Sequence, residues 1–223
     1  MKQTNLELKA QANNYPSLKL SDRHLCDLEL IMNGGFNPLN GFMSKSDYSS
    51  VIQNMRLNDG SLWPMPITLD VDDKFVLEIS KSPKIALRDK EGFILAVLNI
   101  ENIWQPDLEL EAKSVFGTKD TKHPGVHYLL KTSKKNYIGG KVEKVMNPHH
   151  YDFQSIRHSP AELLNIFKDK KWNKVIAFQT RNPLHKAHFE LTMRAMKDLN
   201  ANLLVHPVVG MTKPGDVNHY TRT

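Results

Sequence analysis

The chain has 223 residues, of which 40% are hydrophobic and 24% charged, a composition typical of a globular protein with a buried core. It contains no apolar run of about 18 residues, which excludes a membrane span, and its polar start lacks the apolar segment of a secretory signal. The single cysteine, Cys26, cannot form an internal disulfide, so we expect a buried small side chain in a cytoplasmic protein.

The first part of the chain predicts two short helices around a turn. Residues 1–20 show little periodicity and are expected to run along the surface. Residues 21–32 predict a helix, because a Ser-Asp start can cap it and apolar side chains recur on one face. Those side chains are Leu25, Leu28 and Ile31. Gly and Pro punctuate a turn over residues 34–43, and a second helix is expected to begin after Ser44 or Ser46.

From residue 57 to residue 146 the pattern changes to short apolar runs separated by turn residues. The predicted strands are 66–71, 74–79, 84–89, 94–103 and 137–145. Several strands with tight turns and few helices indicate a small mixed β-barrel. We expect this domain to cover residues 1–150, with a linker near Pro148.

The last part of the chain predicts a strand, a crossover helix and a parallel strand. A helix at 160–169 leads into an apolar run at 175–178, a helical pattern at 184–199 and a second apolar run at 203–209. The helix would bury Leu184, Ala187, Leu191, Ala195 and Leu199. This βαβ unit predicts an α/β fold, and because two parallel strands cannot by themselves form a doubly wound sheet, residues 151–223 are expected to be an incomplete domain.

The turn between the first strand and the crossover helix concentrates polar side chains. Thr180, Arg181 and Asn182 precede Pro183, which is expected at the helix start, and two histidines follow three residues apart on one helical face. A helix N-terminus favours anions, and a guanidinium matches the oxygens of phosphate or sulfate. The turn therefore predicts an anion site at the carboxyl end of a parallel strand.

The charge distribution is consistent with an anionic ligand in this part of the chain. Residues 151–223 hold 11 Lys and Arg against 6 Asp and Glu, whereas residues 1–150 hold 19 against 18. The excess basic charge would favour anions, although a solvated lysine face explains it equally well. The near-neutral first part disfavours a surface that follows nucleic-acid phosphates.

The string QTRNPLHKAH at 179–188, followed by HPVVGMTKPGD at 206–216, closely resembles sulfate adenylyltransferase, also called ATP sulfurylase. Three upstream strings are similar to that family in the same order: GGFNPLNGFM, DGSLWPMPITL and HPGV. The resemblance implies a PUA-like barrel followed by a Rossmann-like nucleotidyltransferase domain. It also implies transfer of AMP from MgATP to sulfate, giving adenosine 5′-phosphosulfate and pyrophosphate in sulfate assimilation.

The resemblance implies a role for each matching residue. Gln179, Asn182, His185 and His188 would bind ATP; Arg181 would bind sulfate; and Thr180, Arg181, Asn182, His185 and His188 would form the catalytic set. Mg²⁺ would arrive with ATP, with no metal ligands from the protein, and the parent enzyme is expected to be a homo-oligomer. The family's Gly-Arg-Asp-His-Ala loop is absent, so these 223 residues are expected to be an amino-terminal portion without turnover.

Two alternatives remain open at this point. Another nucleotidyltransferase with a His-x-x-His motif would use a sugar phosphate or a mononucleotide as the acceptor. A non-catalytic module would bind RNA or a protein partner through the barrel, with the βαβ unit as a scaffold.

Overall fold

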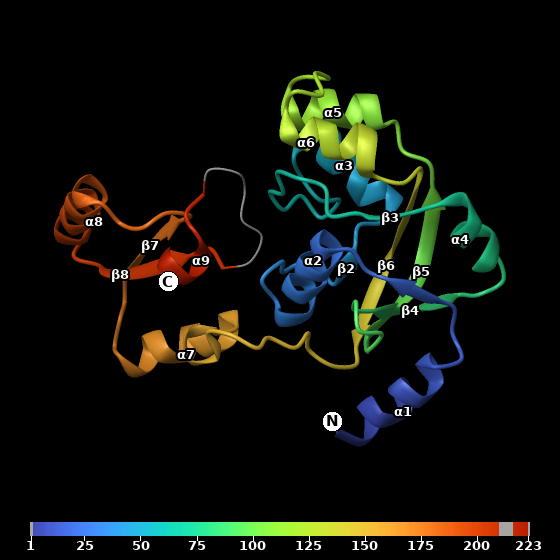
Figure 1. Ribbon diagram of the computed structural model, residues 1–223, viewed down its shortest axis with the longest axis horizontal. Coiled ribbons are helices and arrows are strands. Elements are labelled where there is room, and N and C mark those ends of the chain that lie inside the picture. The colour runs from blue at the N-terminus through green and yellow to red at the C-terminus, as the bar shows by residue number, and fades with distance from the viewer. Residues whose placement is uncertain (1, 210–215, 223) are drawn as a thin grey trace. The chain divides into compact units, whose positions relative to one another are not determined.

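The structure is a computed structural model that describes residues 2–209 and 216–222 (Figure 1). The chain divides into two compact units, residues 1–159 and residues 160–223. Within the described residues the first unit contains a six-stranded sheet, and the second contains a two-stranded sheet.

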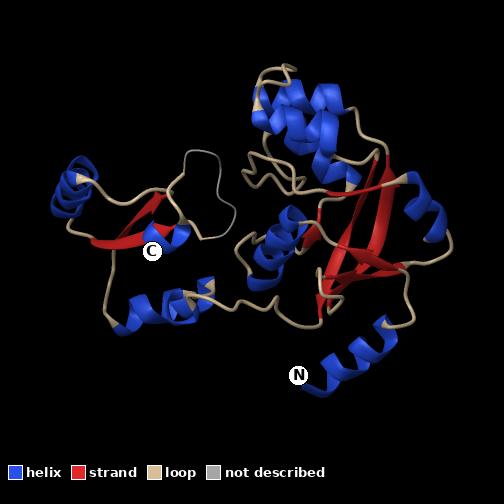
Figure 2. Ribbon diagram, in the orientation of Figure 1, coloured by secondary structure: helices blue, strands red, loops and turns tan. Residues whose placement is uncertain are grey.

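The sheet of the larger unit mixes parallel and antiparallel strands (Figure 2). Its strands are β1 (Ser17–Lys19), β2 (Gly41–Phe42), β3 (Leu69–Val71), β4 (Lys84–Arg88), β5 (Ile94–Trp104) and β6 (Asn136–Lys144). They pair in the order β1-β4-β5-β6-β2, and β3 also pairs with β6. Only the β1–β4 pair is parallel among them. The mixed β architecture predicted for residues 57–146 is confirmed.

The core of this unit forms around β5. Residues 94–98 are an unbroken apolar run, and all five side chains are buried. They join a large cluster that includes Leu95 and Leu98, and a smaller one that includes Ile94 and Val97. A strand buried in this way reads as a continuous apolar run rather than as an alternating one.

Two glycines allow a close approach of backbones where β2 meets β6. A Cβ atom on Gly41 would collide with the carbonyl oxygen of Gly140, which precedes its partner Lys141 on β6. A Cβ atom on Gly139 would collide with the carbonyl oxygen of Met43. The sequence motifs around residues 41 and 139 therefore meet at one crossing that has no room for side chains.

Six α-helices surround this sheet in the described part of the unit. They are α1 (Lys2–Ala12), α2 (Asp22–Asn33), α3 (Lys45–Asn54), α4 (Asp73–Glu78), α5 (Leu108–Phe116) and α6 (Pro124–His127). The prediction of α2 is confirmed: Ser21 accepts a hydrogen bond from the His24 N–H, and Gly34 ends the helix in the left-handed conformation. Ser44 caps α3 in the same way, by accepting a hydrogen bond from the Asp47 N–H.

Residues 1–20 were expected to run along the surface; residues 2–12 of this segment form α1, and its Leu8 and Ala12 pack in the smaller hydrophobic cluster. One prediction of secondary structure in the larger unit is wrong. Residues 74–79 were expected to be a strand, but residues 73–78 form α4. The Asp72 side chain accepts a hydrogen bond from the Phe75 N–H at 2.8 Å, and this N-cap outweighs the β propensity of the short apolar run.

The expected burial of Cys26 is also wrong, because its side chain is exposed. The face of α2 that meets the core carries His24, Leu28 and Ile31, whereas Leu25 is only partly buried. Partial desolvation, together with the carboxylates of Asp27 and Glu29, raises the pKa of the Cys26 thiol. This thiol is therefore poorly suited to act as a nucleophile.

The smaller unit contains the predicted βαβ arrangement. Its elements are α7 (Pro160–Asp169), β7 (Val175–Thr180), α8 (Lys186–Leu199), β8 (Asn202–Pro207) and α9 (His219–Arg222). Strands β7 and β8 pair in parallel, from Val175 opposite Asn202 to Thr180 opposite Pro207. Helix α8 packs against both strands, and Asn200 ends it in the left-handed conformation. The crossover helix and its stop are confirmed.

Two details of α8 differ from expectation. The helix begins at Lys186 rather than at Leu184, with His185 as the N-cap, so Pro183 lies in the turn and not in the first helical position. The predicted core stripe is also wrong: Leu191 and Leu199 are 60% and 57% exposed, whereas Thr192 is buried. The face of α8 that meets the sheet is therefore not the predicted apolar stripe, and Leu191 and Leu199 remain exposed among the described residues.

Candidate active site

The turn between β7 and α8 begins at the carboxyl end of β7, beside the end of the parallel strand β8. Thr180 closes it locally: its hydroxyl donates a hydrogen bond to the Asn182 carbonyl oxygen at 2.5 Å and accepts one from the Asn182 N–H at 3.1 Å. Gln179 is exposed near the end of β7, opposite His206 on β8. The short Thr-Arg-Asn stretch is thereby folded into a compact loop that carries Arg181 at its centre.

The rings of the two histidines at the start of α8 contact one another at an interplanar angle of 34°. The His185 and His188 ring centroids lie 3.9 Å apart, and the His188 ring also contacts that of Phe178. His185 caps α8 because its Nδ1 accepts a hydrogen bond from the Ala187 N–H at 3.3 Å. An accepting Nδ1 places the neutral ring's proton on Nε2, which can donate to an anion. His188 Nδ1 is buried without a hydrogen-bond partner among the described residues.

Arg181 pairs with a residue that the sequence did not single out. Its Nε and Nη2 atoms donate hydrogen bonds to one carboxylate oxygen of Asp216, at 3.0 Å and 2.6 Å. The neighbouring Val217 N–H donates to Asn182 Oδ1 at 3.3 Å. Asp216 follows the second parallel strand, and the convergence of such strands at one edge was the available signal for it.

The structure therefore arranges the predicted residues in two groups. The rings of His185 and His188 contact one another at the start of α8. Thr180, Arg181 and Asn182 form the turn and are tied to Asp216 and Val217. The sequence also predicts a turn at residues 213–216, at the same edge of the sheet; residues 210–215 lie outside the described part of the chain.

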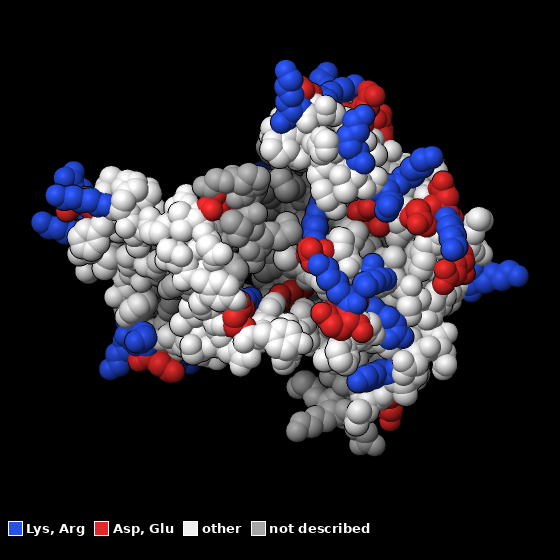
Figure 3. Space-filling view, viewed as in Figure 1, with Lys and Arg blue, Asp and Glu red and all other residues white. Residues whose placement is uncertain are grey.

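The described residues include no cluster of three or more His, Cys, Asp or Glu side chains that could hold a metal ion. Figure 3 shows basic side chains gathered over α8 at one end, whereas basic and acidic side chains alternate over the larger unit. Helix α8 contributes Lys186 in its first turn, next to the β7–α8 turn, and Arg194 and Lys197 in its second half. Of these three cations, Lys186 is the one placed to favour an anion at the turn.

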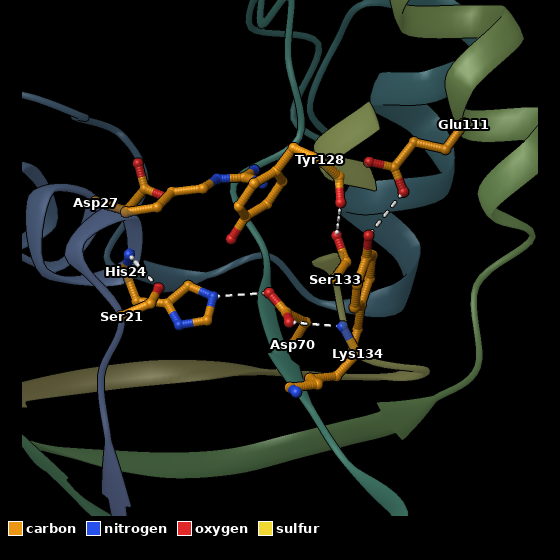
Figure 4. A network of polar contacts seen from close by, with 10 residues as sticks. Ser21, His24, Asp27, Asp70, Glu111, Tyr128, Ser133 and Lys134 are labelled. Carbon is orange, nitrogen blue, oxygen red and sulfur yellow. Dashed lines mark hydrogen bonds and ion pairs between the residues drawn. The ribbon is translucent and has the colours of Figure 1, made fainter. Parts of the chain in front are cut away.

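The larger unit has a polar network of its own, which lies beside a cavity of about 430 Å³ (Figure 4). His24 Nε2 and Asp70 Oδ1 lie 2.8 Å apart, and both side chains are buried. Burial raises the pKa of Asp70, but hydrogen bonds from His24 and the Lys134 N–H outweigh it and lower that pKa overall. Every partner of this pair comes from the larger unit, so the pair acts as a structural tie between α2, β3 and residue 134.

A buried carboxyl group forms a second tie in the same unit. The Tyr48 and Tyr137 hydroxyls donate hydrogen bonds to Glu111 Oε2, at 2.9 Å and 3.0 Å. Burial raises the pKa of Glu111 in spite of these two donors. The contact attaches α5 to α3 and β6.

Comparison with known protein families identifies both parts of the chain. Residues 1–147 match the family described as PUA-like domain, and residues 154–223 match the family described as ATP-sulfurylase. The chain therefore belongs to the PUA-like domain family, and an ATP-sulfurylase segment follows that domain. The expected α/β class, with a PUA-like domain before a nucleotidyltransferase segment, is confirmed.

Named relatives carry the same pair of regions. A sulfate adenylyltransferase from Gibberella zeae is 52% identical over 97% of this chain, and one from Saccharomyces cerevisiae is 46% identical over 100%. The chain spans 38% and 43% of their respective lengths. A solved structure titled hexameric APS kinase from Thiobacillus denitrificans matches 99% of this chain and 39% of its own, at 32% identity and a TM-score of 0.77. The resemblance to sulfate adenylyltransferase is confirmed.

Membrane insertion by a helix finds no support in the structure. Among the described residues, no helix is both long enough and apolar enough to cross a bilayer.

Proposed function

We propose that the chain is part of a sulfate adenylyltransferase, an enzyme that transfers AMP from MgATP to sulfate. One observation carries the proposal: the string QTRNPLHKAH spans the end of β7, the turn and the start of α8, and it places Arg181 in the turn and two contacting histidine rings at the start of the helix. The similarity to named sulfate adenylyltransferases over nearly the whole chain supports the choice of sulfate as acceptor.

The proposed reaction requires alignment of two anions. A sulfate oxygen attacks the α-phosphorus, a new phosphorus–oxygen bond forms, and the bond to the pyrophosphate leaving group breaks. Sulfate is already fully ionised at neutral pH, so no general base is needed. Catalysis then depends on placing donors around charge that is shared between two oxyanions.

The residues of the turn suit these tasks. Arg181 would hold sulfate through charge-assisted hydrogen bonds. His185 would donate from Nε2 to a phosphate oxygen, since its Nδ1 is engaged at the helix cap. Gln179, Asn182 and His188 would contact ATP, and Thr180 would fix the loop near the reacting centre.

Mg²⁺ would enter as a complex with ATP. The ion would be held mainly by the phosphate oxygens of the nucleotide rather than by protein carboxylates. When bound, the ion neutralises phosphate charge, while the chain's own donors orient the nucleotide.

The remaining parts of the proposal concern the protein as a whole. We place the domain boundary at residues 150 and 151, near Pro148 and ahead of the match at 154. A cytoplasmic, homo-oligomeric enzyme is proposed, because a single cysteine suits a reducing compartment and one structural relative is titled hexameric. Adenosine 5′-phosphosulfate and pyrophosphate would be its products. The alternative of an RNA- or partner-binding module is not favoured, because the relatives are named for the enzyme.

Substitution of Arg181 tests the proposal. In the natural protein that contains residues 1–223, Arg181→Ala should lower kcat/KM for sulfate by an amount equivalent to about 1.5–3 kcal/mol, the usual value of a hydrogen bond to a charged group. Sulfate-dependent pyrophosphate release measures it. Arg194→Ala removes an exposed guanidinium from α8 and should leave turnover near the wild-type level. Wild-type sulfate turnover in Arg181→Ala would refute the assignment.

The 223-residue chain by itself gives a second check. We expect at most weak heat of ATP binding by calorimetry and no sulfate-dependent pyrophosphate release. Turnover by this chain would show that the described turn needs no further segment.

A further inference from the structure

Asp216 is the more buried member of its pair with Arg181. Its side chain is 14% exposed, whereas that of Arg181 is 35% exposed. A single carboxylate oxygen accepts hydrogen bonds from both Nε and Nη2 of the guanidinium. These two charge-assisted hydrogen bonds fix the direction of the guanidinium relative to the carboxylate.

A second contact joins the same two segments. Val217, next to Asp216, donates its N–H to the side chain of Asn182, next to Arg181. Two consecutive residues after β8 thus hold two consecutive residues of the β7–α8 turn. The contacts span 35 residues of sequence, so the turn's conformation depends on a segment beyond the second strand.

The carboxylate has two opposite effects on an anion site. It orients the guanidinium, which would otherwise sample several rotamers, and pre-arranged groups react faster than mobile ones. It also brings a negative charge close to the position where an oxyanion would bind, and like charges repel. Orientation and charge can be separated by mutation, because one amide oxygen could accept the two hydrogen bonds that one carboxylate oxygen now accepts.

We propose that Asp216 is a positioning residue for the oxyanion site: it orients Arg181, and its charge sets how tightly the site holds a doubly charged anion. This inference rests on the proposed function. In that reading, Asp216 touches neither substrate and acts through the guanidinium. The hydrogen bond from the Val217 N–H to Asn182 Oδ1 holds the segment of Asp216 beside the turn.

Steady-state kinetics of the natural protein that contains residues 1–223 tests the inference. Asp216→Ala removes the anchor and should lower kcat about 30-fold, as expected when a reacting group is misplaced. Asp216→Asn keeps an oxygen acceptor without the charge, so kcat should stay within about threefold while KM for sulfate falls about fivefold. Asp198→Asn, which removes an exposed carboxylate from the far end of α8, should change neither constant.

A purely structural role would give a different pattern. It would lower kcat in both Asp216 variants, together with thermal stability, and would leave KM for sulfate unchanged. That result, or Asp216 variants that behave like Asp198→Asn, would overturn the inference. KM for sulfate should move more than KM for ATP, because the proposal places Arg181 on sulfate.

A spectroscopic measurement distinguishes failure of the inference from failure of the proposed function. The Arg181 Nε–H signal, assigned by its loss in Arg181→Lys, should be protected from exchange in the wild type and should lose that protection in Asp216→Ala. An unprotected wild-type signal would refute the ion pair itself. A protected signal with normal sulfate turnover in Arg181→Ala would refute the proposed function. Normal turnover only in the Asp216 variants would refute the positioning role alone.

Discussion

The two units of the chain differ in how they bury apolar surface. In the larger unit, β5 and its neighbours contribute to a continuous cluster of buried side chains. In the described part of the smaller unit, only Thr192 is buried, while Phe189 and Leu191 on α8 are 54% and 60% exposed. Apolar patches of this kind are typical of surfaces that pack against something else.

From this difference we infer that one unit mainly stabilises the chain and the other carries the candidate chemistry. The larger unit has the buried apolar area that offsets the conformational entropy of folding. The smaller unit carries the polar turn on a two-stranded sheet, an arrangement that is seldom stable without covered faces. We therefore expect the larger unit to provide most of the folding free energy of this chain, and the turn to carry the candidate chemistry with little benefit to stability.

The largest predicted effect would come from the core of the larger unit. Leu98 is fully buried on β5, so Leu98→Ala should lower the free energy of unfolding by about 4 kcal/mol, through lost transfer energy and a cavity. Leu191→Ala on α8 should change it by less than about 0.5 kcal/mol. Urea denaturation measures both. Equal losses from the two substitutions would break the comparison.

A smaller effect is expected from the buried contact between His24 and Asp70. His24→Ala leaves Asp70 without its imidazole partner and should cost about 1.5–3 kcal/mol at pH 7, the usual value of a hydrogen bond to a charged group. Since the pKa of Asp70 is lowered in the folded state, the cost should shrink as pH falls through that lowered pKa. The double variant His24→Ala/Asp70→Asn should recover part of the loss in urea denaturation. A cost that does not vary with pH would argue against the pair.

The smallest effect concerns Glu111, whose pKa is raised in the folded state by burial. A raised carboxyl pKa stabilises the fold fully below the unfolded value of about 4.3 and loses that contribution as pH rises through the folded value. Relative to Glu111→Gln, which does not titrate, the wild type should therefore lose stability across this window. Denaturation of both proteins from pH 4 upward would measure this loss of stability, which should total about 1 kcal/mol. A parallel pair of curves would exclude the raised pKa.

The sequence predicted most clearly the features that depend on local chemistry. The capped start of α2, the parallel strands β7 and β8 and the stop at Asn200 all follow from side-chain caps, apolar runs and turn residues. These signals lie within a few residues of the structure that they determine, so one sequence suffices to read them.

The errors had two causes: one helix cap that was overlooked, and contacts between residues far apart in the chain. Residues 74–79 have a strand-like composition, but the Asp72 cap and the buried Phe75 ring favour a helix. The apolar stripe on α8 was assigned to the core, although it needs a covering partner to be buried. Asp216 was missed because its partner lies 35 residues earlier, and no periodicity reports such a pairing. The roles of Gln179 to His188 remain predictions.

The crossing of β2 and β6 sets a limit on how this protein can change. Gly41 and Gly139 are about a hundred positions apart in the chain, yet each is confined by carbonyl oxygens that leave no space for a methyl group. A larger residue at either position would therefore require the neighbouring main chain to move. Substitutions in the larger unit should therefore be tolerated best in its surface loops and least at these two glycines.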